Sequence, residues 1–142
     1  LVGDYETSMR MVRVAELEGL RVDRAAAFDL AMSNLARLER VEGIRIEEGV
    51  PIFVIETKDS YGSARLLLLD RWRTRAQSLP GRLVAAAPTR DIVLYTTDRY
   101  PQAVAAMAEI AAGLVTTMPY ALSRALLRLG DEGWEPYQQQ LE

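Results

Sequence analysis

The sequence predicts an α+β domain in which two or three amphipathic helices pack on a mostly antiparallel β-sheet. Apolar runs typical of strands occur in pairs along the chain, and segments with helical spacing separate these pairs. The chain has 142 residues, of which 49% are hydrophobic and 26% charged, close to the commonest single-domain size and composition. We therefore expect a single α+β domain over residues 1–142.

A short strand and two helical segments open the chain. Partial alternation predicts a strand near residues 9–14, and residues 15–20 predict a helical turn. Asp23 is then the expected N-cap of an amphipathic helix over residues 24–40, which stops near Gly43. The apolar face of this helix is expected to consist of Phe28, Ala31, Met32, Leu35 and Leu38.

A strand pair and a long helix follow. Residues 44–47 alternate, whereas residues 52–55 are continuously apolar, which predicts a strand buried on both faces. Residues 59–79 predict one helix that begins at a cap, Asp59 or Ser60, and stops at the Pro-Gly pair that follows. Its expected apolar face is Tyr61, Ala64, Leu68, Trp72, Ala76 and Leu79, while Arg71, Arg73 and Arg75 point mostly away.

The second half of the chain predicts a hairpin and another helix. Two apolar runs over residues 82–98 flank a polar centre, and Pro88 is expected at the second position of the turn. Pro101 suits the first turn of an amphipathic helix over residues 101–118, because its missing N–H has no partner there anyway.

The tail, residues 120–137, fits either a helix or a hairpin. We favour a hairpin with its turn over residues 130–133, where two glycines flank two acidic residues. Pro136 then confines the last strand to a sheet edge, because proline cannot donate a ladder hydrogen bond.

Composition excludes several kinds of chemistry. The chain contains no cysteine and no histidine, so thiolate sites and mechanisms that need a histidine base are absent, and we expect neither a metal nor a cofactor. The net charge is −3 and the arginines are interleaved with acids, which argues against nucleic-acid binding. No apolar run reaches the ~20 residues that span a bilayer, and we expect a cytoplasmic protein without a membrane span.

Two sets of residues are candidates for function. Asp59, Tyr61, Arg90 and Asp91 are candidate ligand-binding residues, although turn formation and helix capping explain the same residues. Trp134 and Tyr137 are candidate interface residues, because aromatic side chains dominate the energetics of protein contacts.

The order of four segments resembles a known family. Residues 17–38, 61–72, 83–98 and 120–135 are similar to the uncharacterised bacterial YtpQ-like family, domain of unknown function family 1444, which is UPF0354-like. That family pairs an alanine-asparagine-leucine helix with a leucine-rich helix, a Pro-x-Arg-Asp hairpin and a Leu-Ser segment followed by Gly-x-Trp. The resemblance implies that this chain is the C-terminal part of a longer protein, and it implies no activity. Arg65 departs from the family pattern, which has a small residue there.

Two functions remain open. The first is a soluble, non-catalytic bacterial domain that acts through a protein partner or as a homo-oligomer. The alternative is a small-ligand-binding or hydrolase-like domain with a carboxylate and arginine cleft around Asp59, Arg90 and Asp91, because carboxylates can do acid–base chemistry without histidine. Convergence of these side chains in a concave pocket would favour the alternative.

Overall fold

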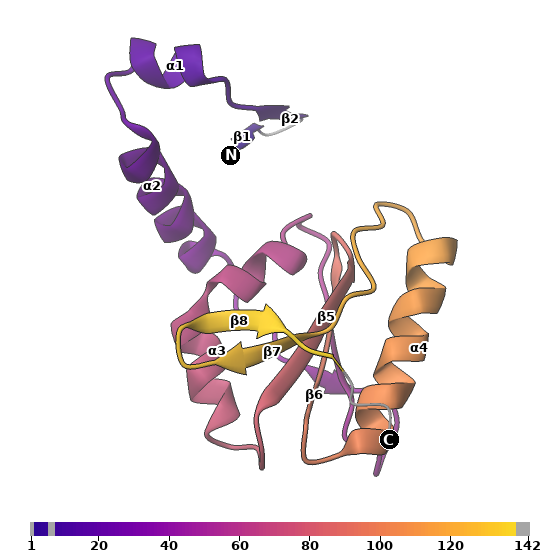
Figure 1. The fold of residues 1–142 in the computed structure, drawn as a ribbon. Helices are drawn as coiled ribbons and strands as arrows, with labels where there is room; N and C mark the ends of the chain where they lie inside the picture. The colour runs from indigo at the N-terminus through magenta and orange to yellow at the C-terminus, as the bar shows by residue number, and fades with distance from the viewer. Residues whose placement is uncertain (1, 6–7, 139–142) are drawn as a thin grey trace. The chain divides into compact units, whose positions relative to one another are not determined.

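The computed structural model describes residues 2–5 and 8–138 and confirms the α+β class (Figure 1). The chain divides into two compact units, unit 1 over Leu1–Glu39 and unit 2 over Arg40–Glu142. The expectation of a single domain over residues 1–142 stays a prediction.

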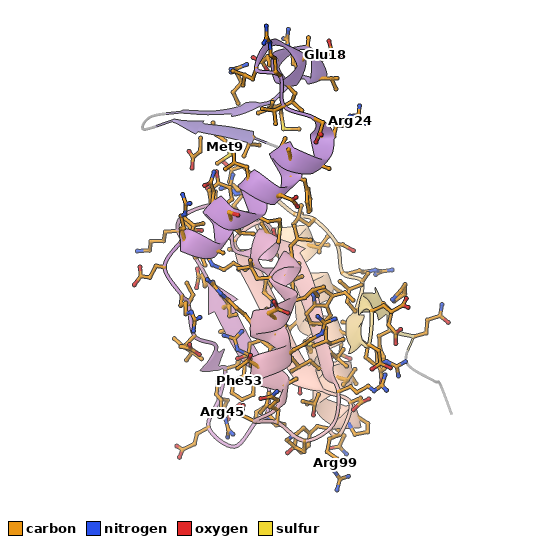
Figure 2. The ribbon with its side chains drawn as sticks, turned by 90° about the vertical axis from the view of Figure 1, so that its left-hand side faces the viewer. Met9, Glu18, Arg24, Arg45, Phe53 and Arg99 are labelled. Carbon is orange, nitrogen blue, oxygen red and sulfur yellow. The ribbon has the colours of Figure 1, made fainter. Side chains whose placement is uncertain are left out.

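Unit 1 contains a two-stranded antiparallel sheet, β1 (Val2–Tyr5) and β2 (Ser8–Met11), followed by α1 (Val14–Gly19) and α2 (Arg24–Arg37) (Figure 2).

The predicted N-cap of α2 is confirmed, since the Asp23 carboxylate accepts a hydrogen bond from the N–H of Ala26 at 2.7 Å. The helix ends earlier than expected, because Leu38 is already extended, with φ −61° and ψ 154°. The apolar face is also partly wrong, since Phe28 is 49% exposed.

Unit 2 is built on a six-stranded antiparallel sheet with the strand order β3-β4-β6-β5-β7-β8. Its strands are β3 (Ile44–Arg45), β4 (Phe53–Glu56), β5 (Leu83–Thr89), β6 (Ile92–Thr97), β7 (Leu127–Gly130) and β8 (Gly133–Pro136). The three predicted strand pairs are therefore confirmed, although the first strand covers only Ile44–Arg45 of the expected residues 44–47, because the chain bends at residues 46 and 47. The tail is a hairpin, and β8, which contains Pro136, lies at the sheet edge as expected.

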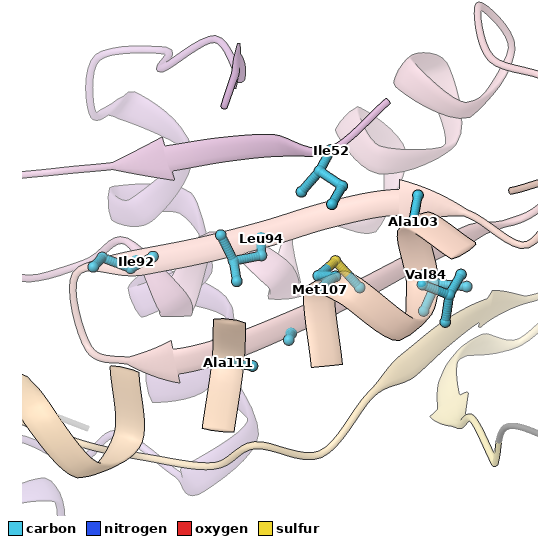
Figure 3. Close-up of a cluster of buried hydrophobic side chains, with 9 residues drawn as sticks. Ile52, Val84, Ile92, Leu94, Ala103, Met107 and Ala111 are labelled. Atoms are coloured by element: carbon cyan, nitrogen blue, oxygen red, sulfur yellow. The ribbon is translucent and has the colours of Figure 1, made fainter. Parts of the chain in front are cut away.

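One face of this sheet is covered by α4 (Pro101–Thr117), in which Pro101 occupies the first turn as predicted (Figure 1). Small and medium side chains let the helix approach closely (Figure 3). The buried cluster consists of Ile52, Val84, Ala86, Ile92, Leu94, Ala103, Val104, Met107 and Ala111.

The opposite face is covered by a 3-10 helix, η1 (Ser63–Leu67), and by α3 (Leu69–Ala76). An aromatic group lies at its centre. The Tyr95 ring stacks on Phe53 at 5.0 Å and meets Trp72 edge-on at 5.3 Å, and Trp72 meets Trp134 edge-on at 5.5 Å. Because β4 places Val54 against the first cluster and Phe53 against this one, its predicted burial on both faces is confirmed.

The prediction of one helix over residues 59–79 is wrong. Leu68 has φ −81° and ψ 66°, which is not helical, and it separates η1 from α3. The start of the segment is bound elsewhere, because the N–H of Thr57 and the N–H of Ser63 donate to the carbonyl oxygens of the β5–β6 turn. Tertiary hydrogen bonds therefore replace the first turns of the expected helix.

The expected position of Pro88 is also wrong. Pro88 is buried within β5, and the turn is formed by Arg90 and Asp91 instead. The register of β5 against β6 shifts between Ala86 and Thr89, so the proline lies at a strand irregularity, where a missing N–H is tolerated.

Candidate functional site

The backbone brings the four predicted site residues to the same end of the sheet. The segment that follows β4 docks on the β5–β6 turn, with the N–H of Thr57 3.0 Å from the Asp91 carbonyl oxygen and the N–H of Ser63 2.9 Å from the Arg90 carbonyl oxygen. The approach is close, since a Cβ on Gly62 would lie 2.6 Å from the Asp91 oxygen. The sequence therefore named residues that lie in neighbouring loops.

The side chain of Asp59 is bound by an arginine. Arg65 donates from Nη1 to Oδ1 at 3.0 Å and from Nη2 to Oδ2 at 2.5 Å, and the N–H of Tyr61 donates to Oδ1 at 2.9 Å. The guanidinium of Arg65 lowers the pKa of Asp59, and the Tyr61 N–H acts in the same direction. Asp59 thus caps the following turn. Capping was one of the explanations that the sequence offered for this residue.

Arg90 and Asp91 pair with each other. The turn bends these adjacent side chains together, with Nε of Arg90 3.2 Å from Oδ1 of Asp91. The guanidinium lies 3.7 Å from the centre of the Tyr120 ring, and the Arg90 N–H donates to the Tyr120 carbonyl oxygen at 3.0 Å. The Asp91 carboxylate raises the pKa of Arg90. The charges at this end of the sheet are therefore compensated locally.

A pocket of about 530 Å³ lies beside α3, and none of the four predicted residues lines it. Trp72 and Ile55 form its buried apolar part, each with 2% of its surface exposed. Its lining comes from residues 40–42, β4, η1, α3 and the residues that flank α3, and it consists of Arg40, Val41, Glu42, Ile55, Arg65, Leu68, Asp70, Arg71, Trp72, Thr74, Arg75 and Ser78. All of these residues belong to unit 2. The volume is in the range of small-ligand sites.

The pocket, in the following termed the α3 pocket, is rich in guanidinium groups, with four arginines against two carboxylates. Arg75 is the best positioned of them. Its guanidinium lies 4.8 Å from the centre of the Trp72 ring and 5.2 Å from that of Tyr95, and it donates to the carbonyl oxygen of Val41 at 3.4 Å. The prediction that Arg75 points away from the core is therefore wrong, because the aromatic rings attract its cationic head.

The carboxylates of the α3 pocket are exposed. The Glu42 side chain is 83% exposed and lies 3.6 Å from Arg75, and the Asp70 side chain is fully exposed and lies 3.7 Å from Arg73. Within the described residues, no group of three or more acidic side chains could hold a metal ion. The arrangement suits the binding of an anion by guanidinium groups.

Sequence reasoning missed the α3 pocket because its residues were assigned to a helix face and to solvent. The one signal was Arg65, which stood out as a departure from the family pattern. It is 6% exposed and lines the pocket, while its guanidinium binds Asp59.

The two candidate interface residues both make contacts within unit 2. The indole N–H of Trp134 donates to the carbonyl oxygen of Leu66 at 2.7 Å, and Tyr137 packs against the cluster under α4. Their role in contacts with another protein stays a prediction.

Comparison with known proteins gives one distant relative. The chain is 28% identical over 91 residues to a UPF0354 protein of Listeria welshimeri; the match covers 64% of this chain and 34% of that protein. The match supports the UPF0354-like resemblance of the sequence motifs. This chain therefore corresponds to about a third of the relative's length, and its C-terminal placement in a longer protein stays a prediction. No family model and no solved structure matches the chain. Among the described residues, no helix is both long and apolar enough to cross a membrane.

Proposed function

We propose that this chain is a non-catalytic binding domain that recognises a carboxylate-bearing partner in the α3 pocket. The observation that carries the proposal is the placement of Arg75, whose guanidinium is held between two aromatic rings and a backbone carbonyl oxygen at the pocket wall. A guanidinium fixed in this way loses little conformational entropy when it binds a carboxylate through two hydrogen bonds.

The internal partner of Arg75 is weakly held. The Glu42 carboxylate lies 3.6 Å away and is 83% exposed, so this ion pair contributes little to stability. A carboxylate of a partner that enters the pocket beside Arg75 would exchange the exposed pair for a more desolvated one. Glu42 therefore marks the position that the ligand's carboxylate occupies.

Binding is better supported than acid–base chemistry. A catalytic carboxylate is usually tuned by burial or by a like charge, whereas Glu42 and Asp70 are exposed and each lies beside an arginine. The cleft that the sequence suggested around Asp59, Arg90 and Asp91 gains less support, because Arg65 and Asp91 already occupy its charged groups.

A hexaglutamate peptide is a suitable probe, with inorganic phosphate as the second anion. Binding is followed by tryptophan fluorescence, because Trp72 lines the pocket, and by amide shifts in ¹⁵N–¹H spectra. We expect saturable binding of the peptide, with amide shifts confined to residues 40–42 and α3. Arg75→Gln should weaken it at least about tenfold, because a charged hydrogen bond and its stacked geometry are both lost.

The matched control is Arg99→Gln, which removes one positive charge from an exposed residue outside the α3 pocket. It should leave the affinity within about twofold. Equal losses of peptide affinity in Arg75→Gln and Arg99→Gln would mean that general charge attraction explains the binding. That result would refute the site. Absence of saturable peptide binding by the wild-type chain would refute the proposed function itself.

A further inference from the structure

The first residues of unit 2 form one wall of the α3 pocket. Helix α2 ends at Arg37, strand β3 begins at Ile44, and residues 39–43 between them have no regular structure. Three of these residues line the pocket together with α3: Arg40, Val41 and Glu42, in the following termed the wall segment. A ligand in the pocket therefore contacts the part of unit 2 that the chain enters directly from unit 1.

The downstream end of the wall segment is firmly fixed. A Cβ on Gly43 would overlap the Tyr95 hydroxyl oxygen, so the backbone lies directly on that ring, which stacks on Phe53 at 5.0 Å. Ile44 then pairs with Val54 of β4. The wall segment can therefore move only upstream of Gly43.

The wall segment itself is held mainly by one side chain. Arg75 donates from Nη2 to the carbonyl oxygen of Val41 at 3.4 Å, and the same nitrogen lies 3.6 Å from Oε2 of Glu42. Among the described residues, these contacts are the only hydrogen bond and the only ion pair of residues 40–42. Val41 adds partly buried packing on the cluster that contains Trp72. The hydrogen bond is long and the ion pair is exposed, so the segment is docked but weakly held.

A bound carboxylate competes for the same nitrogen. The N–H groups of a guanidinium form two parallel pairs, Nη1 with Nη2 and Nε with Nη2, and a carboxylate that accepts two hydrogen bonds uses one of these pairs. Either geometry occupies an N–H of Nη2. In Arg75 this nitrogen is the one that faces both Val41 and Glu42. A ligand carboxylate therefore takes an N–H group that now holds the wall segment.

We propose that ligand binding in the α3 pocket releases the wall segment, an inference that rests on the proposed function of this pocket. Without ligand, Arg75 holds residues 40–42 against α3. With ligand, Arg75 binds the ligand's carboxylate and the chain upstream of Gly43 is free to move. Binding and release are linked, so occupancy of the pocket controls how firmly the connection to unit 1 is held.

Limited trypsin digestion of the 142-residue chain measures the release. Mass spectrometry gives the initial rate of cleavage after Arg40, which follows the population of chains whose wall segment has left its contacts. Cleavage after Arg124, an exposed residue in an irregular stretch of unit 2, is the internal reference. We expect saturating hexaglutamate to raise the ratio of the two rates about three- to tenfold, the effect of losing two weak contacts.

Arg75→Gln removes the same contacts without a ligand. It should raise the ratio by about the same three- to tenfold and make it insensitive to the peptide. The matched control is Arg73→Gln on the same helix. Arg73 also has one hydrogen bond to a backbone carbonyl oxygen, that of Asp131 at 3.1 Å, and one exposed ion pair, with Asp70. Because it has no contact with the wall segment, its loss should leave the ratio within about twofold of wild type.

The outcomes separate this inference from the proposed function. Saturable peptide binding with an unchanged or lower ratio would overturn the release and leave the proposed function standing. Absence of peptide binding in the fluorescence titration would refute the proposed function, and release by a ligand would fall with it. A ratio in Arg75→Gln that equals that of Arg73→Gln would show that Arg75 does not hold the wall segment. That result would overturn the inference even where the peptide binds.

Discussion

Arg65 holds both carboxylate oxygens of Asp59, with Nη1 3.0 Å from Oδ1 and Nη2 2.5 Å from Oδ2. The arginine side chain is 7% exposed and the aspartate side chain 34% exposed, so the pair is buried on one side only. The carbonyl oxygen of Arg65 also accepts the indole N–H of Trp72 at 2.9 Å. One residue therefore connects the loop after β4 to α3 and to the pocket beside it.

Asp59→Asn should destabilise the protein by about 2 kcal/mol at pH 7, because it leaves the buried guanidinium of Arg65 without its counter-charge. This value lies below that of a fully buried pair because Asp59 is partly exposed. Urea unfolding followed by far-UV circular dichroism measures the difference. The control Asp131→Asn, at an exposed turn residue, should change the free energy of unfolding by less than about 0.5 kcal/mol.

The same pair predicts a pH dependence. Arg65 holds the pKa of Asp59 below its usual value of 3.8, so its contribution to stability is fully present above pH 3.8. That contribution is lost as the pH falls through the lower pKa of the folded state. The free-energy difference between wild type and Asp59→Asn should therefore shrink between pH 5 and pH 2. A difference that stays constant over this range would contradict the role assigned to the Asp59 charge.

Gly43→Ala should destabilise unit 2 by about 1–3 kcal/mol. A Cβ at this position would overlap the Tyr95 hydroxyl oxygen and lie 2.6 Å from Cζ, and the ring cannot move away because Phe53 and Trp72 hold it. Thermal unfolding checks the change. Gly113→Ala is the opposite case, because no atom lies within 4 Å of its Cβ position in α4, and it should stabilise by up to about 1 kcal/mol. Equal effects of the two substitutions on thermal stability would mean that the Tyr95 ring moves to make room for the Cβ.

Periodicity and turn chemistry predicted the strands and their pairing well, because both depend on residues close in sequence. The acidic turn between two glycines in the tail and the cap at Asp23 gave the observed local structure, whereas the alternation over residues 44–47 gave a strand that covers only Ile44–Arg45. Residues 59–79 failed for a tertiary reason. Their helical spacing is real, but hydrogen bonds to the β5–β6 turn outweigh the helix at its start.

The site was predictable only in part. Arg90 and Asp91 are neighbours in the sequence, so a turn at this point can bring their side chains together as an ion pair. The structure shows that pair. The α3 pocket, in contrast, depends on where residues 40–42 pass over α3. Arg75 was assigned to solvent by its charge, whereas its attraction to the Trp72 and Tyr95 rings exists only after the sheet has brought Tyr95 beneath α3.

Trp134→Phe should destabilise the protein by about 1–2 kcal/mol, because it removes the N–H that binds the carbonyl oxygen of Leu66 and part of the packing on Trp72. Urea unfolding of the isolated chain measures this loss. If Trp134 acted chiefly as an anchor for another protein, the substitution would leave monomer stability unchanged. That outcome would contradict the internal role that its contacts indicate.

Glu42→Gln should raise the affinity of the α3 pocket for hexaglutamate by about two- to fivefold, the amount expected from an exposed ion pair. The substitution removes the carboxylate that competes for Arg75 and keeps the size of the side chain. Tryptophan fluorescence titration at low salt measures the gain, and salt near 1 M should abolish most of it. Glu48→Gln, at an exposed residue outside the pocket, makes the same change in net charge and should raise the affinity less. Equal gains in the two variants would show that net charge, and not release of Arg75, controls binding.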